Sequence, residues 1–474
     1  MESFPKGSDT FFRLSPVADG EPEWFALQRG EAKWRLDPHF HRPRFSNLLH
    51  RLEKLGASRL GSLIGRSGEL WDQKDGRFRT EFPYIEISAV GLGNDEYAVS
   101  MVETSKAPSR ARQVVRADDI LVSLTRPHRG AIAGIRGVDD GAIASTGFCV
   151  LRDLKDRRLS KKYLMAVLRS SIGLDQLLMR SSGGNYPAIT EDELENVLIP
   201  IPATAKLQND LVTAIDAAQA ARLNKLAEAE TLLAGLDDYL LATLGLAPPP
   251  TDERKVFAVS LADLGAQARL NADYFHPERI LSIRALAANT QKLNCSRLEQ
   301  VVDFIRDQIK TPGPNYLSLA NVQSNTGALL ATDENVTGAC SVFQHGDVLF
   351  ARLRPYLNKV HATEIDGCCS PEFHVLRSKN NEILRPDYLA AILRSRLTLA
   401  QTRHMMTGNT HPRLTNDDVV NLVIPVPKPV VQEAVAAEAR RRRDEARRLR
   451  TEADSGWQAA KTWFEEQLLG PVQR

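Results

Sequence analysis

The chain has 474 residues, of which 43% are apolar and 25% are charged, and its net charge is +2. This length exceeds what one hydrophobic core usually serves, so we expect two or more domains in an ordinary globular protein. The small net charge excludes a uniformly basic surface, so binding to a polyanion would have to use local patches.

The sequence gives two indications of compartment. The opening stretch "MESFPKGSDTFF" has no apolar signal core, and no apolar run approaches the about 18–20 residues of a membrane helix. Five cysteines are present without a CxxC pair, which indicates a reducing environment. We therefore expect a cytoplasmic protein without a membrane partner.

Five segments of the chain occur twice, in the same order, with offsets between 225 and 238 residues. The pairs are "RLDPHFHRP" (35–43) with "RLNADYFHP" (269–277), "SRLGSLIG" (58–65) with "SRLEQVVD" (296–303), 119–127 with 347–355, "YLMAVLRS" (163–170) with "YLAAILRS" (388–395), and "SGGNYPAITEDELENVLIPIP" (182–202) with "TGNTHPRLTNDDVVNLVIPVP" (407–427). Because chance would not keep this order, we infer a duplicated domain whose copies each have about 200 residues.

Each copy mixes short strands and helices. Segments rich in Val and Ile predict strands, among them "EFPYIEISAV", "DDILVSL" and "GFCVLRDL" in the first copy and "DVLFARL" and "EFHVLRS" in the second. Helical spacing follows in "SKKYLMAVLRSSIGLDQLLMRS" and "PDYLAAILRSRLTLAQTRHMM". The predicted fold class is therefore α+β.

A long helix is predicted after each copy. Apolar residues recur there at spacings of three and four, without an interrupting proline. A helix of roughly 40 residues is about 60 Å long, more than one such domain can cover, so we expect the two helices to form an antiparallel coiled coil. The predicted order is copy one (1–202), helix one (203–245), a linker (246–254), copy two (255–427) and helix two (428–470).

Motifs for catalysis are missing from the sequence. There is no phosphate-binding GxxxxGK[ST] loop, and the Pro248–Pro250 run lacks the neighbours of an amino-methyltransferase motif. A loose nuclease-like match, Pro22-Glu23 with Glu31-Ala32-Lys33, is interpreted as a solvated charged segment. The pair in "HFH" (39–41) is interpreted as packing rather than metal binding. We expect no catalytic residue, cofactor or metal in this chain.

A strand followed by a basic turn occurs once in each copy. Arginine can fork to guanine or phosphate, asparagine can pair with adenine, and lysine mainly meets phosphate, so the turns are candidates for DNA contact. The alternative is that these arginines hold structural ion pairs. The candidates are Arg126, His128 and Arg129 in the first copy, and Arg352, Arg354, Tyr356, Asn358 and Lys359 in the second.

Base readout is expected where the copies differ, and phosphate contact where glycines let the backbone approach. The differing segments are 103–116, with Lys106, Arg110, Arg112 and Arg116, and 306–315, with Lys310. The glycine loops contain Asn185 and Tyr186 in one copy and Asn409 and His411 in the other; a plain turn before the final strand is the alternative. The run "ARRRRDEARRLR" (439–450) is interpreted as a solvated or partner-facing helix surface.

Taken together, "GDVLFARLRPYLNKV" (346–360), "RLNADYFHP", the two glycine loops and the helix after each copy resemble the specificity (S) subunit of type I restriction–modification enzymes. The resemblance runs through both halves. The family commonly enters its helix with "PLPPLxEQ"; Gln432 fits that glutamine, Gln208 comes one residue late, and neither follows a glutamate.

The resemblance implies that each copy is a target recognition domain reading one half of an asymmetric sequence in double-stranded DNA. The helices would space the halves and dock two methyltransferase (M) subunits, which carry S-adenosylmethionine and methylate adenine. Restriction (R) motor–nuclease subunits would join for cleavage. Two alternatives stay open, namely the specificity component of another phage-defence modification system and a stand-alone sequence-specific DNA-binding regulator.

Overall fold

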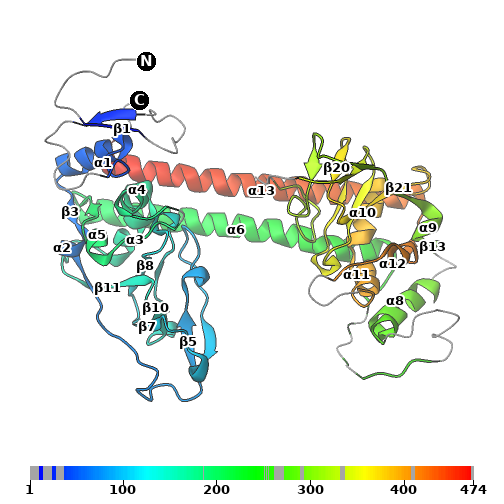
Figure 1. Ribbon diagram of the computed structural model, residues 1–474, viewed down its shortest axis with the longest axis horizontal. Helices are drawn as coiled ribbons and strands as arrows, with labels where there is room; N and C mark the ends of the chain where they lie inside the picture. The colour runs from blue at the N-terminus through cyan, green and yellow to red at the C-terminus, as the bar shows by residue number, and fades with distance from the viewer. Residues whose placement is uncertain are drawn as a thin grey trace. The chain divides into compact units, whose positions relative to one another are not determined.

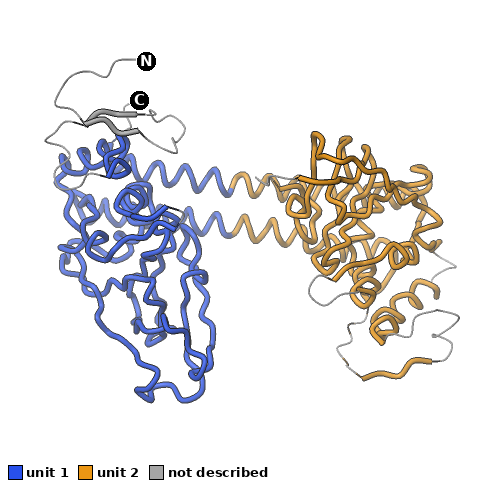
Figure 2. The backbone as a smooth tube through the Cα atoms, in the orientation of Figure 1, with its two compact units in different colours: residues 1–223, 453–474 blue, residues 224–452 orange. Residues whose placement is uncertain are grey.

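The structure is a computed structural model that describes residues 10–13, 24–27, 37–184, 186–249, 251, 254, 256–260, 272–288, 293–330, 337–406 and 412–470. The chain forms two compact units, one of residues 1–223 with 453–474 and one of residues 224–452 (Figure 2). Each unit therefore contains one sequence copy together with part of both long helices.

The elements of the first unit follow the chain in the order that Figure 1 labels. Its strands are β1 (Thr10–Arg13), β2 (Trp24–Leu27), β3 (Ser58–Arg59), β4 (Ile64–Arg66), β5 (Glu81–Ile85), β6 (Ser100–Glu103), β7 (Ala111–Val114), β8 (Ile120–Ser123), β9 (Ile132–Gly134), β10 (Ile143–Ser145), β11 (Phe148–Leu154) and β12 (Leu198–Ile199). Its helices are α1 (Pro43–Lys54), α2 (Leu60–Leu63), α3 (Lys161–Arg169), α4 (Ser171–Arg180), α5 (Glu191–Glu195) and the start of α6 (Ala205–Thr243), with short 3-10 turns that include η3 (Pro127–Arg129).

The second unit repeats this series. Its strands are β13 (Cys295–Arg297), β14 (Val302–Ile305), β15 (Gln308–Ile309), β16 (Tyr316–Leu317), β17 (Cys340–Phe343), β18 (Val348–Ala351), β19 (Val360–Ala362), β20 (Gly367–Cys369), β21 (Phe373–Ser378) and β22 (Val423–Pro425). Its helices are α8 (Pro277–Ala288), α9 (Leu298–Val301), α10 (Pro386–Arg394), α11 (Arg396–Thr402), α12 (Asn416–Val420) and the start of α13 (Pro429–Leu469), with the 3-10 turns η5 (Asp273–Phe275) and η6 (Pro355–Leu357).

The sheets of the two units have the same topology except for one edge strand, since β6 pairs with β5 whereas β15 pairs with β17. The order β4-β11-β8-β9, antiparallel throughout, corresponds to β14-β21-β18-β19. The parallel pair β5-β10 with antiparallel β7 corresponds to β16-β20 with β17. The register agrees as well, since Phe148 lies opposite Ser123 and Phe373 lies opposite Ala351. The α+β class and the internal duplication predicted from the sequence are thus present in the fold.

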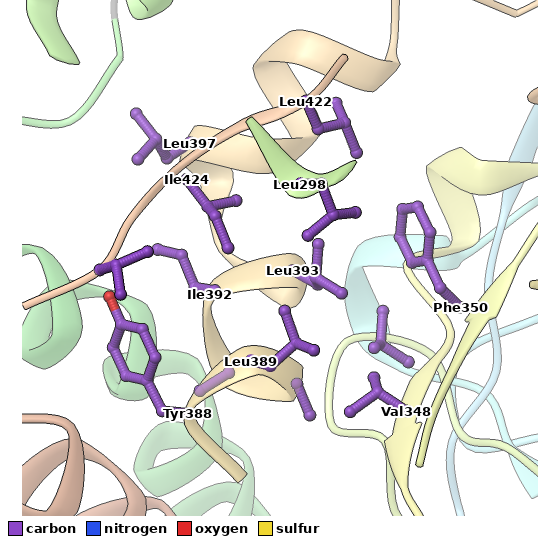
Figure 3. Packing of buried hydrophobic residues seen from close by; sticks show 14 of the residues in the cluster. Leu298, Val348, Phe350, Tyr388, Leu389, Ile392, Leu393, Leu397, Leu422 and Ile424 are labelled. Carbon is purple, nitrogen blue, oxygen red and sulfur yellow. The ribbon is translucent and has the colours of Figure 1, made fainter. Parts of the chain in front are cut away.

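The largest apolar cluster of each unit joins a central strand, β8 or β18, to the helix α3 or α10. In the second unit, Leu389 and Leu393 of α10 face Val348 and Phe350 of β18 (Figure 3). The Tyr388 hydroxyl donates to the carbonyl of Pro425 at 2.9 Å, and Tyr163 donates to Pro200 in the same way at 2.7 Å. Because a buried hydroxyl needs a partner, these bonds attach the last strand to the helix in both units.

Each predicted helical segment before the glycine loop is two helices rather than one. Helix α3 ends at Ser170, whose backbone is extended with ψ 170°, and α4 then begins. Ser395 breaks α10 from α11 in the same way, with ψ 156°. Ser395 also caps α11 by accepting from the N–H of Thr398. Serine favours such capping over a helix interior, which explains the break at Ser395.

The two long helices that the sequence predicts are present, and within each unit they lie side by side and antiparallel (Figure 1). In the first unit, Arg222 of α6 donates to Asp454 of α13 at 3.0 Å. In the second unit, the Lys225 ammonium lies 2.6 Å from Glu452, and Ala229 packs against Ala446 and Leu449. Small apolar residues at this contact let the two helix backbones approach closely.

A buried aspartate precedes the central strand of each unit. Asp347 accepts a bidentate pair of bonds from Arg377, both at 2.7 Å, and the backbone N–H of Gln344 at 2.8 Å. Asp119 accepts from Arg152 at 3.1 and 2.9 Å. Such bidentate bonds to a buried carboxylate fix the start of the strand and its neighbour β21 or β11.

We expect Asp347→Ala to lower the free energy of unfolding of the second unit by about 2–4 kcal/mol, because it leaves a turn N–H and a guanidinium without their acceptor. Urea unfolding followed by circular dichroism would measure the change. Asp303→Ala is the control, since this exposed carboxylate lies 4.0 Å from Lys379, and a pair of that kind contributes about 1 kcal/mol or less. Equal effects of the two substitutions would contradict the assigned role of Asp347.

Candidate nucleic-acid interface

The basic turn of the first unit follows β8 directly. Arg126 adopts a left-handed backbone conformation with φ 48° and ψ 49°, and its N–H donates to the carbonyl of Pro187 at 2.7 Å. Pro127 then starts the 3-10 turn η3, which ends at Gly130 with φ 75°. A central sheet strand and two fixed turn positions therefore hold the arginine side chains of this turn.

The glycine loop of the first unit packs on that turn. Ser182 and Ala188 exchange backbone hydrogen bonds of 2.8 Å, and a bridge joins Ala188 to Thr125. Gly183 has φ 99°, and a Cβ there would lie 3.1 Å from a backbone oxygen, so glycine is required. Tyr186, which is 71% exposed, lies with its ring 4.2 Å from the Arg126 guanidinium carbon. Two motifs predicted separately thus form one surface.

Three of the predicted DNA-contacting arginines line one cleft in this unit. The cleft has a volume of about 680 Å³ and is lined by Arg110, Arg126 and Arg129 together with Tyr84 and Leu92. Arg110 and Arg129 are exposed, and Arg126 is half-buried. Guanidinium groups on the wall of a concave surface form a local positive patch although the net charge of the chain is small.

The other candidate residues of the first unit lie in different surroundings. His128 is half-buried, and its burial, followed by the charges of Arg129 and Arg126, lowers its pKa, so this ring is neutral near pH 7. Lys106 is exposed and pairs with Glu103 at 2.9 Å. These contacts leave the two residues as weaker candidates than the cleft arginines.

Segment 103–116 divides into exposed and structural arginines. Arg112 is exposed, with Asp72 at 3.7 Å. Arg116 instead donates to Glu69 at 3.1 Å, and Arg152 donates to the same carboxylate at 2.8 Å. The hydrogen bond from Arg116, with help from that of Arg152, lowers the pKa of Glu69, so the carboxylate is charged and engaged within the unit. Arg116 therefore has a structural contact, whereas Arg112 stays a predicted DNA contact.

The turn of the second unit has the same backbone. Arg354 has φ 49° and ψ 57°, and its N–H donates to the carbonyl of Pro412 at 2.8 Å. A bridge joins Leu353 to Arg413, which itself pairs with Glu372 at 2.7 Å. The Arg354 side chain is exposed, and its prediction as a DNA contact remains compatible with this position.

Other predicted residues of this turn have contacts inside the unit. Asn358 is buried, has φ 52°, and donates to the carbonyl of Arg394 at 2.8 Å. The Lys359 ammonium donates to the carbonyl of Leu319 at 2.6 Å. Arg352 is half-buried, and its Nε has no hydrogen-bond partner within the part of the chain that the structure describes. The contacts of Asn358 and Lys359 favour a role in holding the turn, and the DNA-contact prediction for Arg352 stays a prediction.

The structure describes two of the remaining five candidate residues. Tyr356 is 49% exposed in η6, and Lys310 is exposed directly after β15. Asn185, Asn409 and His411 lie outside the described residues. The DNA-contact predictions for all five residues stay predictions.

Carboxylates pair with most of the arginine-rich run on α13. The arginines with such a partner are Arg440, Arg441, Arg442, Arg447, Arg448 and Arg450. Pairs of this kind on an exposed helix face offset the positive charge locally. Arg441, Arg447 and Arg448 are exposed, whereas Arg440, Arg442, Arg443 and Arg450 are half-buried, so the interpretation as a solvated or partner-facing surface fits only part of the run.

Several contacts that build the interface could not be read from the motifs alone. The carbonyls of Pro187 and Pro412 hold the two turns, and the cleft walls contain Tyr84 and the exposed Leu92. Pro187 and Pro412 occupy corresponding positions of the repeat, 225 residues apart. This correspondence is the one signal in the sequence that points to their contacts with Arg126 and Arg354. Nothing in the spacing of Tyr84 or Leu92 marks them, because Tyr84 belongs to a different sheet and Leu92 lies outside the strands, in a bridge with Ala131.

None of the helices in the described part of the chain has the length and apolar character that crossing a membrane requires.

No family model matches the chain. Among solved structures, it is similar to a chain in a study of the assembly and conformational transition of the type I restriction–modification system (21% identity, TM-score 0.45, 88% of this chain and 97% of that one). It is also similar to the HsdS subunit of Thermoanaerobacter tengcongensis (20%, TM-score 0.37, 88% and 96%) and to a type I S subunit of M. genitalium (14%, TM-score 0.44, 88% and 96%). All three TM-scores are low, so these likenesses carry no argument about function.

A curated relative gives a match in sequence. Over 140 residues the chain is 30% identical to the specificity subunit of the type I restriction enzyme EcoDI of Escherichia coli. The matched stretch covers 28% of this chain and 30% of that relative. This match confirms the resemblance of the chain to the specificity subunits of type I restriction enzymes.

Proposed function

We propose that the chain is the DNA-recognition subunit of a type I restriction–modification complex. Residues 1–202 and 255–427 would be its two target recognition domains, joined by spacer helices at 203–245 and 428–470 and by the linker 246–254. Each domain reads one half of a bipartite, asymmetric target in double-stranded DNA. The chain itself would be non-catalytic and cytoplasmic.

One observation carries the proposal most directly. Arg110, Arg126 and Arg129 converge on one cleft of about 680 Å³, next to the exposed ring of Tyr186. Guanidinium groups can bind guanine edges or phosphates with paired hydrogen bonds, and a nearby aromatic ring adds a stacking surface. Arg110, Arg129 and Tyr186 are exposed, as contact with a ligand requires.

The duplication supports the second part of the proposal. Two units with the same antiparallel four-stranded sheet and the same left-handed arginine turn fit a ligand that offers two similar sites, as duplex DNA does about every 34 Å. The differing segments 103–116 and 306–315 would give the two half-sites different sequences. The long helices would fix the gap and dock two methyltransferase subunits carrying S-adenosylmethionine for adenine methylation, with restriction subunits added for cleavage.

The test of this function is the methylation pattern of the host genome. Long-read sequencing should find one two-part adenine-methylated motif, and deletion of the gene for this chain should remove it. A motif that persists after deletion, with changed transcription of a few genes, would favour the stand-alone regulator instead. A palindromic motif would contradict two independent recognition domains.

Arg129→Ala is expected to weaken binding of the chain to any DNA duplex and to lower the salt slope of log K by about one, if the guanidinium contacts phosphate. If the guanidinium reads a base, the loss of binding free energy is about 1–3 kcal/mol and is confined to DNA sequences that contain that base. Fluorescence anisotropy across a series of salt concentrations separates these results. Arg158→Ala is the control, because Arg158 is exposed, pairs with Asp156 at 2.6 Å and does not line the cleft. Equal losses for both variants would contradict the cleft as the binding surface.

A further inference from the structure

Two histidines and a glutamate meet in the second unit, away from the basic turn. His276 and Glu278 lie at the start of α8, and His404 follows the end of α11. One nitrogen or oxygen atom of each side chain lies within 4.8 Å of those of the other two. His276 is 8% and Glu278 5% exposed, and the side chain of His404 is 15% exposed. The cluster is therefore enclosed within the unit.

His404 contacts both other members of the cluster. Nε2 of His404 lies 2.8 Å from Oε2 of Glu278, and Arg403 contacts the same carboxylate at 3.2 Å. The rings of His276 and His404 are stacked, with centroids 3.8 Å apart. A neutral imidazole nitrogen is the form that binds a metal ion.

The duplicated unit provides an internal comparison. By the offsets of the sequence repeat, the positions of His276, Glu278 and His404 correspond to Arg42, Arg44 and Met179 in the first unit. Helix α1 packs against α4 there, as α8 packs against α11 in the second unit. None of the three corresponding residues can replace a zinc ligand in a His₂Glu set, so the shared scaffold folds without this cluster. Its presence in one copy alone points to a property of the second unit.

We propose that His276, Glu278 and His404 form a Zn²⁺ site. Two imidazole nitrogens and one carboxylate oxygen are a common zinc ligand set, and a water molecule completes the tetrahedron. Zinc–ligand bonds of about 2.0–2.2 Å place tetrahedral ligand atoms roughly 3.5 Å apart. Ligand atoms as far apart as 4.8 Å would approach by about 1 Å, and Nε2 of His404 and Oε2 of Glu278, which are 2.8 Å apart, would separate slightly. The half-exposed Arg403 side chain would release Glu278, and the long 3.3 Å contact from the Glu278 N–H to His276 Nδ1 is weak enough to give way.

The position of the site indicates what the ion does. It would join the first residues of α8 to a residue three positions before the segment 407–411. That segment contains Asn409 and His411, which are predicted to contact DNA. A zinc ion there would act as a clamp between the start of α8 and the residues that follow α11. The inference does not depend on the proposed function, because the ligands themselves define it.

Zinc binding by the full-length chain tests the proposal. The protein should be prepared without a histidine tag and treated with EDTA, and then titrated with ZnCl₂ by calorimetry and with CoCl₂ by visible absorption. We expect one saturable site per chain and a cobalt spectrum typical of tetrahedral coordination. His404→Ala should weaken binding at least about tenfold, the scale on which even the partners of metal ligands act. Met179→Ala, at the corresponding position of the first unit, should leave binding unchanged.

A second variant controls for the case in which His404→Ala does not fold. Glu278→Gln has nearly the same shape and removes only the charged ligand, so it should also weaken binding while its circular dichroism spectrum stays that of the parent chain. Absence of a saturable site in the parent chain would overturn the proposal. Binding that neither His404→Ala nor Glu278→Gln alters would overturn it too, because the ion would then lie elsewhere.

Discussion

Ala229→Pro is expected to lower the free energy of unfolding of the second unit by about 3 kcal/mol or more. Ala229 is fully buried on α6, where it packs against Ala446 and Leu449 of α13. A proline there removes one backbone hydrogen bond and places its ring against the preceding turn, so the helix bends away from its partner. Thermal unfolding followed by circular dichroism should show the loss directly.

Ala227→Gly is the matched control for this substitution. Ala227 is exposed on the same helix, so glycine there costs about 1 kcal/mol through backbone entropy alone. Under the proposed function, Ala229→Pro should also weaken assembly with methyltransferase subunits in size-exclusion chromatography, whereas Ala227→Gly should not. An unchanged unfolding midpoint for Ala229→Pro would show that the two helices do not support each other.

Exchanging residues 1–202 for those of a homologous subunit should change one half of the methylated motif and leave the other half intact. Each unit has its own sheets, basic turn and apolar core, so the first recognition domain can be replaced without disturbing the side chains of the second. This is the largest functional effect that the proposal predicts, because a complete half-site changes at once. Methylation-sensitive sequencing of a host that carries the chimera would report both halves and the gap.

The reciprocal exchange of residues 255–427 serves as the control for the chimera and should change the opposite half only. The gap should stay constant in both chimeras, since both long helices are retained. A chimera with both half-sites altered would refute independent reading by the two domains. A chimera that folds but methylates the parental motif would place recognition outside the exchanged residues.

The duplication made much of the fold predictable. The strands β8 and β18 and the helices α3 and α10 could be read from apolar patterns, because each pattern occurs twice and the copies support each other. What remained hidden is the pairing of strands far apart in sequence, such as β5 with β10. Pairing of that kind depends on which faces become buried together, and local sequence does not record it.

Buried glutamines show the same limit at the level of single residues. Gln208 accepts from the N–H of Ser160 at 2.7 Å and donates to the carbonyl of Arg158 at 2.8 Å. Gln432 accepts from the N–H of Arg385 at 2.9 Å in the corresponding place. In the sequence, Gln208 stands one residue later than the family pattern leads one to expect, but its contacts match those of Gln432. The start of a helix can place a glutamine in the same contacts after a shift of one residue, but a sequence pattern with fixed spacing does not match the shifted residue.

The candidate interface could be predicted in part. The basic turn and the glycine loop stood out by residue type, but their contact through Arg126 and Tyr186 depends on the tertiary fold. Residue type alone also could not separate Arg354, which is exposed, from Asn358, which is buried and bonded to the carbonyl of Arg394. The difference depends on position, because Arg354 precedes the 3-10 turn η6 and Asn358 follows it, next to the end of α10.

The left-handed conformation of Arg126 and Arg354 has a further consequence. For a residue with a Cβ, this backbone shape costs about 1–2 kcal/mol relative to the right-handed one, whereas glycine adopts it freely. Each unit therefore holds an arginine at a position where glycine would relieve local strain and make the chain more stable. Strain of this kind is common at functional sites, but Asn358 shows that it also occurs at a residue that bonds within its own unit. The two turns thus hold two guanidinium groups at a cost in stability, which the proposed contact with DNA would explain.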